Sequence, residues 1–403
     1  MFQSHSTPLT VVHSLPVWLP NTATYLYNQV RYLPPEISNY VVCATTQNLD
    51  QFGVNGIHSL DAFCRWRRLW NLALRKLGVR RFLGHLVPVA KRYQAKILHS
   101  HWGDVAWRDM NAAKKANLRH VVTFYGKDVN YLPQHQPRWR RRYQELFRHV
   151  DLVLCEGVHM ASCIVALGCP AAKVRVQHLG VEVRRIFFAP RVWDRSKPLR
   201  VLISASFREK KGIPYALEAL ARLTKDVSQL EITIIGDGSA DPRSIVEKTK
   251  VLRTLRKYQL TNRTRLLGYQ PHAVLFAEAY KHHIFISPSI TASDGDTEGG
   301  APVTIIEMAA SGMPIVSTKH CDIPSVVIDG ETGFLAAERD VDGLLSHLRW
   351  LVEHPEQWRR ITDKGRLHIE AEYDVVNQCE RLAQTYLSIA RGSEIGNDVQ
   401  NFQ

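Results

Sequence analysis

Short apolar runs rich in β-branched residues alternate along this chain with segments whose apolar residues recur at helical spacing. The runs are continuous rather than alternately apolar and polar, which is typical of parallel strands covered on both faces. They predict strands at residues 9–15, 39–45, 95–101, 120–125, 151–157, 200–206, 230–236, 283–289 and 314–319. Helical patterns such as residues 214–227 and 302–311 separate them. This rhythm predicts an α/β fold with doubly wound sheets.

The rhythm stops at residues 187–198, FFAPRVWDRSKP, where two prolines and mixed charges replace any periodicity. A length of 403 residues also favours two domains. We therefore predict two Rossmann-like domains facing each other across a deep cleft, where such folds bind ligands. The expected parts are an N-terminal domain, a C-terminal domain, a terminal helix packing back on the first domain and a disordered tail, at residues 1–188, 189–374, 375–392 and 393–403.

The net charge of +14 is unevenly distributed along the chain. Residues 1–190 hold 25 Lys and Arg against 10 Asp and Glu, a net of +15, whereas the remainder holds 27 against 28. A basic half of this kind favours an anionic partner, such as a membrane surface, a phosphorylated substrate or nucleic acid. No nucleic-acid-binding motif accompanies the charge, so we expect no nucleic-acid partner. The seven cysteines are scattered without CxxC spacing, which indicates a reducing compartment and no structural zinc.

The densest basic stretch is residues 65–87, in which Trp66 and Trp70 lie four residues apart on one helical face. Two interpretations stay open for it: an interfacial helix on an anionic membrane, or a surface helix with one face on the core. Four arginines around Trp139 form a second basic cluster. The sequence has no apolar run long enough for a membrane span and no signal-peptide pattern. We therefore expect a cytoplasmic protein, peripheral on the inner face of the membrane.

Two predicted strand-to-helix turns carry the candidate chemistry. In the first, Arg208, Lys210 and Lys211 follow a strand and precede a helix, where backbone donors and the helix dipole favour anions. A merely solvated basic turn is the plain alternative. In the second, Glu298 precedes a helix that contains Glu307 among apolar residues, and a pair of carboxylates is suited to accept hydrogen bonds from sugar or ribose hydroxyls.

Other residues of the second turn support the same interpretation. A glycine pair directly after Glu298 lets the backbone approach a phosphate closely, and Pro302 fits the first helical position. Asp294 and Asp296 form a DxD string in the preceding loop. A polar loop explains that string better than a metal site does, because no third ligand is evident.

These motifs resemble those of the family-4 glycosyltransferases, particularly the bacterial exopolysaccharide and colanic-acid type. The resemblance is carried by EGGAPVTIIEMAASGMPIVST with IDGETGFL, by the turn ending KKG, and by IIGDG, LGYQP and ISPS in the same order; HSHWG and TFYGKDV are weaker landmarks. It covers essentially the whole chain and is loose before residue 95. It implies the GT-B fold and retaining transfer of a hexose-type sugar without a cofactor or metal.

The resemblance also implies roles for individual residues. Lys211 would contact the donor diphosphate, Glu307 the ribose and Glu298 the donor sugar, and Arg208 would join Lys211 and Glu298 as a catalytic candidate. The other donor-binding candidates are Ser206, Tyr269, Gly300, Ala301, Pro302 and Val303. The acceptor-side candidates are His101, Tyr125 and Asp128.

The chain departs from the family pattern at three places. Glu298 and Glu307 lie nine residues apart instead of eight, Ser206 stands where the family has an arginine, and Tyr125 stands where it often has a histidine. The expected partners are a nucleotide-sugar donor, a lipid-linked or polysaccharide acceptor in exopolysaccharide, lipopolysaccharide or glycolipid synthesis, and an anionic membrane surface. An epimerase or phosphorylase of the same fold, and an inactive module that binds a membrane or a partner enzyme, stay open as alternatives.

Overall fold

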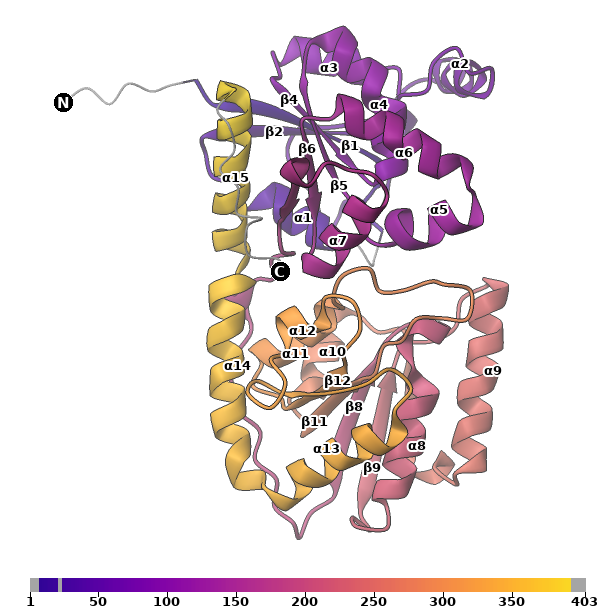
Figure 1. Cartoon of the computed structure of the whole chain (residues 1–403), viewed down its shortest axis with the longest axis vertical. Coiled ribbons are helices and arrows are strands. Elements are labelled where there is room, and N and C mark those ends of the chain that lie inside the picture. Colours follow the sequence, from indigo (N-terminus) through magenta and orange to yellow (C-terminus); the bar gives the residue numbers. More distant parts are fainter. Residues whose placement is uncertain (1–6, 21–23, 393–403) are drawn as a thin grey trace, which may run out of the picture. The chain divides into compact units, whose positions relative to one another are not determined.

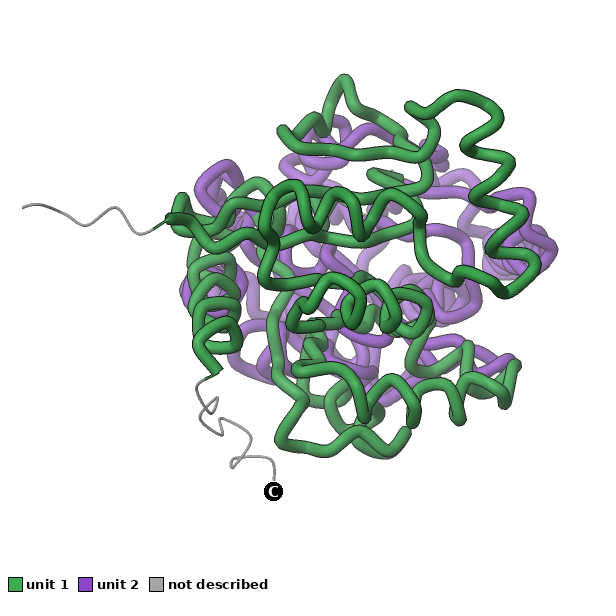
Figure 2. The backbone as a smooth tube through the Cα atoms, turned by 90° about the horizontal axis from the view of Figure 1, so that it is seen from above, with its two compact units in different colours: residues 1–181, 375–403 green, residues 182–374 purple. Residues whose placement is uncertain are grey.

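The chain forms two compact units, each built on one parallel β-sheet. A computed structural model describes residues 7–20 and 24–392. Unit 1 comprises residues 1–181 and 375–403, and unit 2 comprises residues 182–374 (Figure 2). Unit 2 is thus inserted in the chain between the two segments of unit 1.

The sheet of unit 1 has seven strands in the order β3-β2-β1-β4-β5-β6-β7, with parallel neighbours (Figure 1). The strands are β1 (Leu9–Trp18), β2 (Ile37–Thr46), β3 (Ile57–Ser59), β4 (Ile97–His101), β5 (Arg119–Thr123), β6 (Leu152–Cys155) and β7 (Val174–Val176). The helices are α1 (Thr24–Arg31), α2 (Arg65–Lys76), α3 (Leu86–Arg92), α4 (Gly103–Ala116), α5 (Leu132–His135), α6 (Arg138–His149), α7 (Val158–Ala166) and α15 (Val375–Arg391).

The sheet of unit 2 has six parallel strands in the order β10-β9-β8-β11-β12-β13. The strands are β8 (Leu199–Ser204), β9 (Leu230–Ile235), β10 (Thr264–Gly268), β11 (Ile284–Ser287), β12 (Ile315–Thr318) and β13 (Phe334–Ala336). The helices are α8 (Ile213–Leu223), α9 (Pro242–Lys257), α10 (His272–Ala279), α11 (Val303–Ala310), α12 (Ile323–Val326), α13 (Val341–Glu353) and α14 (Trp358–Glu372).

Each sheet reverses its strand order once, between β1 and β4 in unit 1 and between β8 and β11 in unit 2. In open α/β sheets, ligands bind outside the carboxyl ends of the strands at this switch point, because the loops there diverge to opposite faces. The predicted site residue His101 ends β4, and the basic turn with Lys211 follows β8. The topology therefore places His101 and Lys211 at the switch points of the two sheets.

The apolar runs of the sequence become the buried strands, as predicted. Val11, Val12, Ile97 and Leu98 in unit 1 are fully shielded from solvent, as is Val201 in unit 2. The nine predicted strands are the interior strands of the two sheets, and the four strands that the sequence does not predict, β3, β7, β10 and β13, are the four sheet edges. An edge strand pairs on one side only, so it needs no long apolar run.

The unit boundary lies elsewhere than the predicted 188/189, because the chain enters unit 2 at Glu182. The predicted linker, residues 187–198, is instead fastened to that unit by the buried guanidinium of Arg191. That group donates hydrogen bonds to the carbonyl oxygens of Ser311 at 3.0 Å, His282 at 3.1 Å and Ala279 at 3.2 Å. Proline and mixed charge therefore mark a tightly held segment and not a flexible link.

Helix α15 belongs to unit 1 and lies along its sheet (Figure 1). Leu382, Ala383, Tyr386 and Ile389 join one hydrophobic cluster with strand residues such as Val121. The predicted disordered tail, residues 393–403, lies outside the described residues. Within the described part of the chain, no helix has the length and apolar character required to cross a membrane.

Candidate functional site

The basic turn after β8 is held close to the end of β11. Lys211 ends a short 3-10 turn, and Gly212 follows with a φ of +62°. A Cβ atom at this glycine would lie 1.9 Å from the carbonyl oxygen of Pro288, so any side chain there would force the two segments apart. Helix α8 then begins at Ile213, which places the turn at a helix N-terminus as predicted.

Lys211 and Glu298 form a buried ion pair, with the ammonium nitrogen 2.8 Å from the carboxylate oxygen Oε2. The other oxygen of Glu298 accepts a hydrogen bond from the Ser289 hydroxyl at 2.8 Å. Burial by itself would raise the pKa of this carboxyl, but the ammonium groups of Lys211 and Lys210 and the two hydrogen bonds hold it at about 2. Glu298 is therefore a fixed acceptor across the physiological pH range.

The DxD carboxylates are paired with basic side chains. Asp296 lies 3.2 Å from the Lys210 ammonium and 3.5 Å from the Arg208 guanidinium. Asp294 pairs with Arg243 at 3.0 Å. The two loop carboxylates are therefore held by ion pairs to the basic turn and to Arg243.

Glu307 is nine-tenths buried on α11, where Oε1 shares a hydrogen bond with Nε2 of His272 at 2.8 Å. This bond raises the pKa of His272, against the opposing effect of partial burial. Pro302 directly precedes α11, one residue before the helical position that the sequence predicts. His272 was missed by the sequence reasoning, although it follows LGYQP and begins α10.

The remaining donor-side candidates lie in loops at the carboxyl ends of the strands of unit 2 or at the start of α11. Ser206 lies in the turn after β8, and Gly300 and Ala301 lie in the loop before α11. Val303 begins α11. Tyr269 follows β10 with 57% of its surface exposed, so its ring is free to contact a flat ligand.

A second missed residue, His320, supports the backbone of the loop before α11. Its Nε2 accepts a hydrogen bond from the Glu298 amide at 3.1 Å, and its Nδ1 lies 2.6 Å from the Glu338 carboxylate. The histidine is fully buried and follows β12 by two residues. His320 therefore helps to fix the backbone position of Glu298. The spacing of the two glutamates in the sequence does not reveal this contact.

The three acceptor-side candidates of unit 1 lie together at the carboxyl end of β4. Nδ1 of His101 and the hydroxyl of Tyr125 are 2.6 Å apart. Asp128 accepts backbone hydrogen bonds from Gly103 at 2.7 Å and from Tyr125 at 3.0 Å. Burial raises the pKa of Asp128 to about 7, in spite of these bonds. Its carboxyl is therefore able to exchange a proton near neutral pH.

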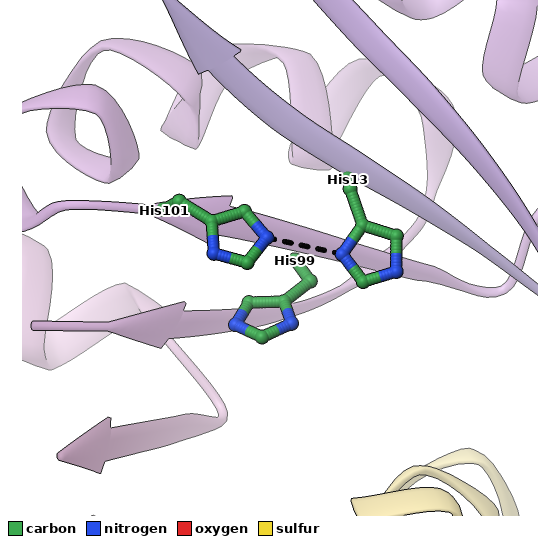
Figure 3. Close-up of side chains that lie close together, drawn as sticks. All are labelled: His13, His99 and His101. Carbon is green, nitrogen blue, oxygen red and sulfur yellow. Dashed lines mark hydrogen bonds between the residues drawn. The ribbon is translucent and has the colours of Figure 1, made fainter. Parts of the chain in front are cut away.

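His101 also belongs to a buried cluster of three histidines, together with His13 and His99 (Figure 3). Nδ1 of His13 and Nε2 of His101 share a hydrogen bond at 3.0 Å. His99 contacts the hydroxyls of Tyr386 at 2.6 Å and Thr123 at 2.7 Å. Burial lowers the pKa of His13 to about 3 and those of the other two well below the usual value. All three imidazoles are therefore neutral.

Neutral imidazoles are the form that binds transition metals, and one ring nitrogen from each histidine lies within 4.8 Å of the others. Among the described residues, this trio is the group whose spacing would accept an ion. Five of the six ring nitrogens have a hydrogen-bond partner, and the bond of His101 to Tyr125 orients that imidazole. Nε2 of His13 is buried without one in the part of the chain that the structure describes. The expectation that no metal is needed stays a prediction.

Helix α2 projects most of its side chains into solvent. Trp66 is 81% exposed and Trp70 66% exposed, and of its twelve residues only Asn71 is buried. A surface helix packed on the core would bury its apolar face. The first part of the basic stretch does not pack on the core in this way, whereas Phe82, Leu83 and Leu86 later in the same stretch are buried in a core cluster of unit 1.

The comparisons with known proteins cover both units. The model of “Glycosyl transferases group 1” matches residues 188–368, and that of “Glycosyltransferase Family 4” matches residues 22–185. WcaL of Escherichia coli K12, named as a colanic acid biosynthesis glycosyltransferase, is 33% identical over 303 residues, 72% of this chain and 70% of that protein. The amylovoran biosynthesis glycosyltransferase AmsK of Erwinia amylovora is 29% identical over 290 residues, 70% of this chain and 68% of that protein.

A solved structure shares the fold. Anabaena HepE in complex with UDP and glucose has a TM-score of 0.74 at 16% identity, and the match covers 94% of this chain and all of that one. At this identity the likeness establishes the architecture and leaves ligand and reaction open.

Proposed function

We propose that this chain, which belongs to the family-4 glycosyltransferases and has their GT-B fold, moves a hexose-type sugar from a nucleotide-sugar donor to a lipid-linked or polysaccharide acceptor with retention. The reaction fits the synthesis of an exopolysaccharide, a lipopolysaccharide or a glycolipid. The observation that carries the proposal is the buried Lys211–Glu298 pair, which lies at the switch point of a six-stranded parallel sheet.

The leaving group of the proposed reaction explains why basic side chains gather after the carboxyl end of β8. When the bond to the sugar breaks, the nucleoside diphosphate gains negative charge, and prearranged positive groups stabilise that charge in the transition state. Lys211, Lys210 and Arg208 would contribute these charges, with the backbone N–H groups of Gly300, Ala301 and Val303 at the start of α11. Because the protein supplies the cations, we propose that transfer needs no metal.

The same end of the sheet also offers hydrogen-bond acceptors for the ribose and the sugar of the nucleotide-sugar. Glu307 would accept hydrogen bonds from the ribose hydroxyls, and Glu298, fixed as an anion, would accept them from the sugar. The exposed ring of Tyr269 would stack on the nucleobase. The proposed donor class is a hexose linked to a nucleoside diphosphate.

The acceptor would bind unit 1 near His101, Tyr125 and Asp128. Asp128, whose pKa burial raises to about 7, is suited to hold or take up a proton close to the acceptor hydroxyl. The basic surface of unit 1, led by α2 with Trp66 and Trp70 exposed, would rest on an anionic membrane. The proposed location is peripheral, on the cytoplasmic face.

The donor assignment is tested with Lys211→Ala. A thermal-shift screen of the full chain against UDP-, GDP- and ADP-sugars identifies the base, since a ligand that binds the folded state raises its stability by mass action. Lys211→Ala should abolish the shift and the transfer of sugar. Lys225→Ala, which removes an exposed lysine of the same unit, should leave both unchanged. Normal nucleotide binding by Lys211→Ala would refute the site.

Membrane attachment is tested by flotation of the full chain with vesicles. Trp66→Ala with Trp70→Ala should reduce binding to vesicles that contain anionic lipid. Val192→Ala with Leu367→Ala also removes two exposed apolar side chains, but from unit 2, and should have no effect. Equal binding of wild type and of the Trp66/Trp70 double variant would contradict the role of α2.

A further inference from the structure

Three arginines of unit 1 surround two perpendicular tryptophans, and we call this group the Arg–Trp cluster. The rings of Trp107 on α4 and Trp139 on α6 lie 5.7 Å apart at 82°, and both side chains are buried. The guanidinium carbons of Arg81 and Arg142 lie 4.2 and 4.3 Å from the centre of the Trp107 ring. Arg142 also lies 4.7 Å from the centre of the Trp139 ring, and Arg108 lies 5.9 Å from it.

The positive charge of the Arg–Trp cluster is poorly compensated. Arg108 pairs with Asp104 at 2.9 Å. Across residues 7–20 and 24–392, by contrast, Arg81 and Arg142 have no carboxylate within ion-pair distance. Glu145 is close, but its Oε2 accepts the indole N–H of Trp107 at 2.8 Å. Within the described residues, Arg81 and Arg142 therefore lie over the same indole without an ion pair of their own, and Glu145 is the carboxylate whose charge acts on Arg142.

The pKa of Arg142 indicates the same excess of positive charge. Burial lowers the pKa of Arg142, and the neighbouring charges of Arg138, Arg81 and Arg108 lower it further against the opposing effect of Glu145. Neighbouring like charges raise the free energy of a site, and an anion that joins them lowers it. Stacking on an indole also fixes the plane of a guanidinium, which leaves its N–H edge directed for paired hydrogen bonds to a phosphate.

We infer that the Arg–Trp cluster is a binding site for a phosphomonoester or diphosphate group, presented by a lipid headgroup at the membrane surface. The inference deepens the proposed membrane attachment and rests on it. Helix α2, which exposes Trp66 and Trp70, supplies the context, since the charge of its Arg75 interacts with that of Arg108 in the cluster.

The test separates a built phosphate site from diffuse charge. Full-length protein is floated with phosphatidylcholine vesicles that contain phosphatidic acid, a phosphomonoester, or phosphatidylglycerol, a phosphodiester, at matched zeta potential. Wild type should prefer phosphatidic acid, and Arg81→Gln with Arg142→Gln should weaken that binding at least about tenfold. Arg141→Gln with Arg148→Gln removes two exposed charges from α6 and should preserve the preference.

A charge-conserving variant decides the matter if the glutamine pair fails to fold. Arg81→Lys with Arg142→Lys keeps the net charge but loses the planar, two-pronged donor. It should bind both anionic vesicles equally, without the preference for phosphatidic acid. An unchanged preference in this variant, or no preference in wild type, would overturn the inference.

Two further measurements distinguish a phosphate site from diffuse charge, and the lipid site from the donor site. Inorganic pyrophosphate should release wild type from phosphatidic acid vesicles at concentrations at which sulfate of equal ionic strength does not; equal release by both salts means diffuse charge. The Arg81/Arg142 variants should retain the thermal shifts of wild type with UDP-, GDP- and ADP-sugars, and Lys211→Ala should retain the lipid preference. Failure of the donor site and failure of the phosphate site are therefore distinguishable. Tight binding of RNA that vesicles do not displace would also overturn the inference.

Discussion

The Lys211–Glu298 pair predicts a specific acid sensitivity of unit 2. Glu298 has a folded-state pKa of about 2 against an ordinary value of 4.5. A carboxyl with a depressed pKa contributes stability above its unfolded pKa and loses it as the pH falls toward the folded one. Over the whole shift the contribution is roughly 3 kcal/mol, and about 2 kcal/mol of it disappears between pH 7 and pH 3.

Glu298→Gln removes this contribution and leaves the Lys211 ammonium, only 17% exposed, without its partner. We expect the variant to be less stable than wild type by about 3 kcal/mol at pH 7, within the range found when one member of a buried pair is lost. At pH 3 wild type has itself lost most of the advantage. The difference between the two proteins should therefore shrink by about 2 kcal/mol.

Urea denaturation followed by pulsed hydrogen exchange measures this difference, because peptides of β8 and α8 report on unit 2 alone. Glu353→Gln is the control, since this exposed carboxylate lies in the same unit and its loss should change stability by less than about 0.5 kcal/mol. A destabilisation by Glu298→Gln that is equal at pH 7 and pH 3 would refute the reasoning.

Three further predictions concern single residues. His272 has a raised pKa through its bond to Glu307. Its contribution to the stability of the fold is therefore full below the ordinary pKa of 6.5 and is lost as the pH rises through the pKa of the folded state. Thermal unfolding of His272→Gln between pH 6 and 9 should lack this decline in stability. Gly212→Ala should lower stability toward urea by at least about 2 kcal/mol, whereas Gly330→Ala, also at positive φ but with open space around it, should cost only about 1. Tyr125→Phe should slow transfer about tenfold at low acceptor concentration with donor affinity unchanged; an altered donor Kd would contradict its place on the acceptor side.

Interior strands could be predicted from the sequence because a strand buried on both faces requires a continuous apolar run. Edge strands escape that requirement, and the residues of β10 show why. Arg265 and Leu266 are exposed, although both lie in the middle of the strand. Such a segment has no signature that separates it from a loop. Its pairing with β9 is a property of the assembled sheet.

The sequence indicates several single residues of the candidate site, but neither His272 and His320 nor the contacts between residues. Lys211 and Glu298 each lie in a recognisable motif, but nothing in the sequence indicates that they form an ion pair across 87 residues. The contact of Glu307 with His272 and the support of the Glu298 amide by His320 were likewise invisible. These bonds depend on where loops converge at the sheet edge, which local pattern does not encode.

The insertion of unit 2 into unit 1 has a consequence for the order in which the protein is made. The hydroxyl of Tyr386 bonds to His99, which lies 287 residues earlier in the chain, and Leu382 and Ile389 cover Val11 and Ile97 of the first sheet. A ribosome therefore releases all of unit 2 before it supplies the helix that covers this sheet. Through that interval unit 1 exposes an apolar face while unit 2 already has all its strands. Exposed apolar surface favours aggregation, so the interval before α15 is made is the vulnerable stage in the synthesis of this chain.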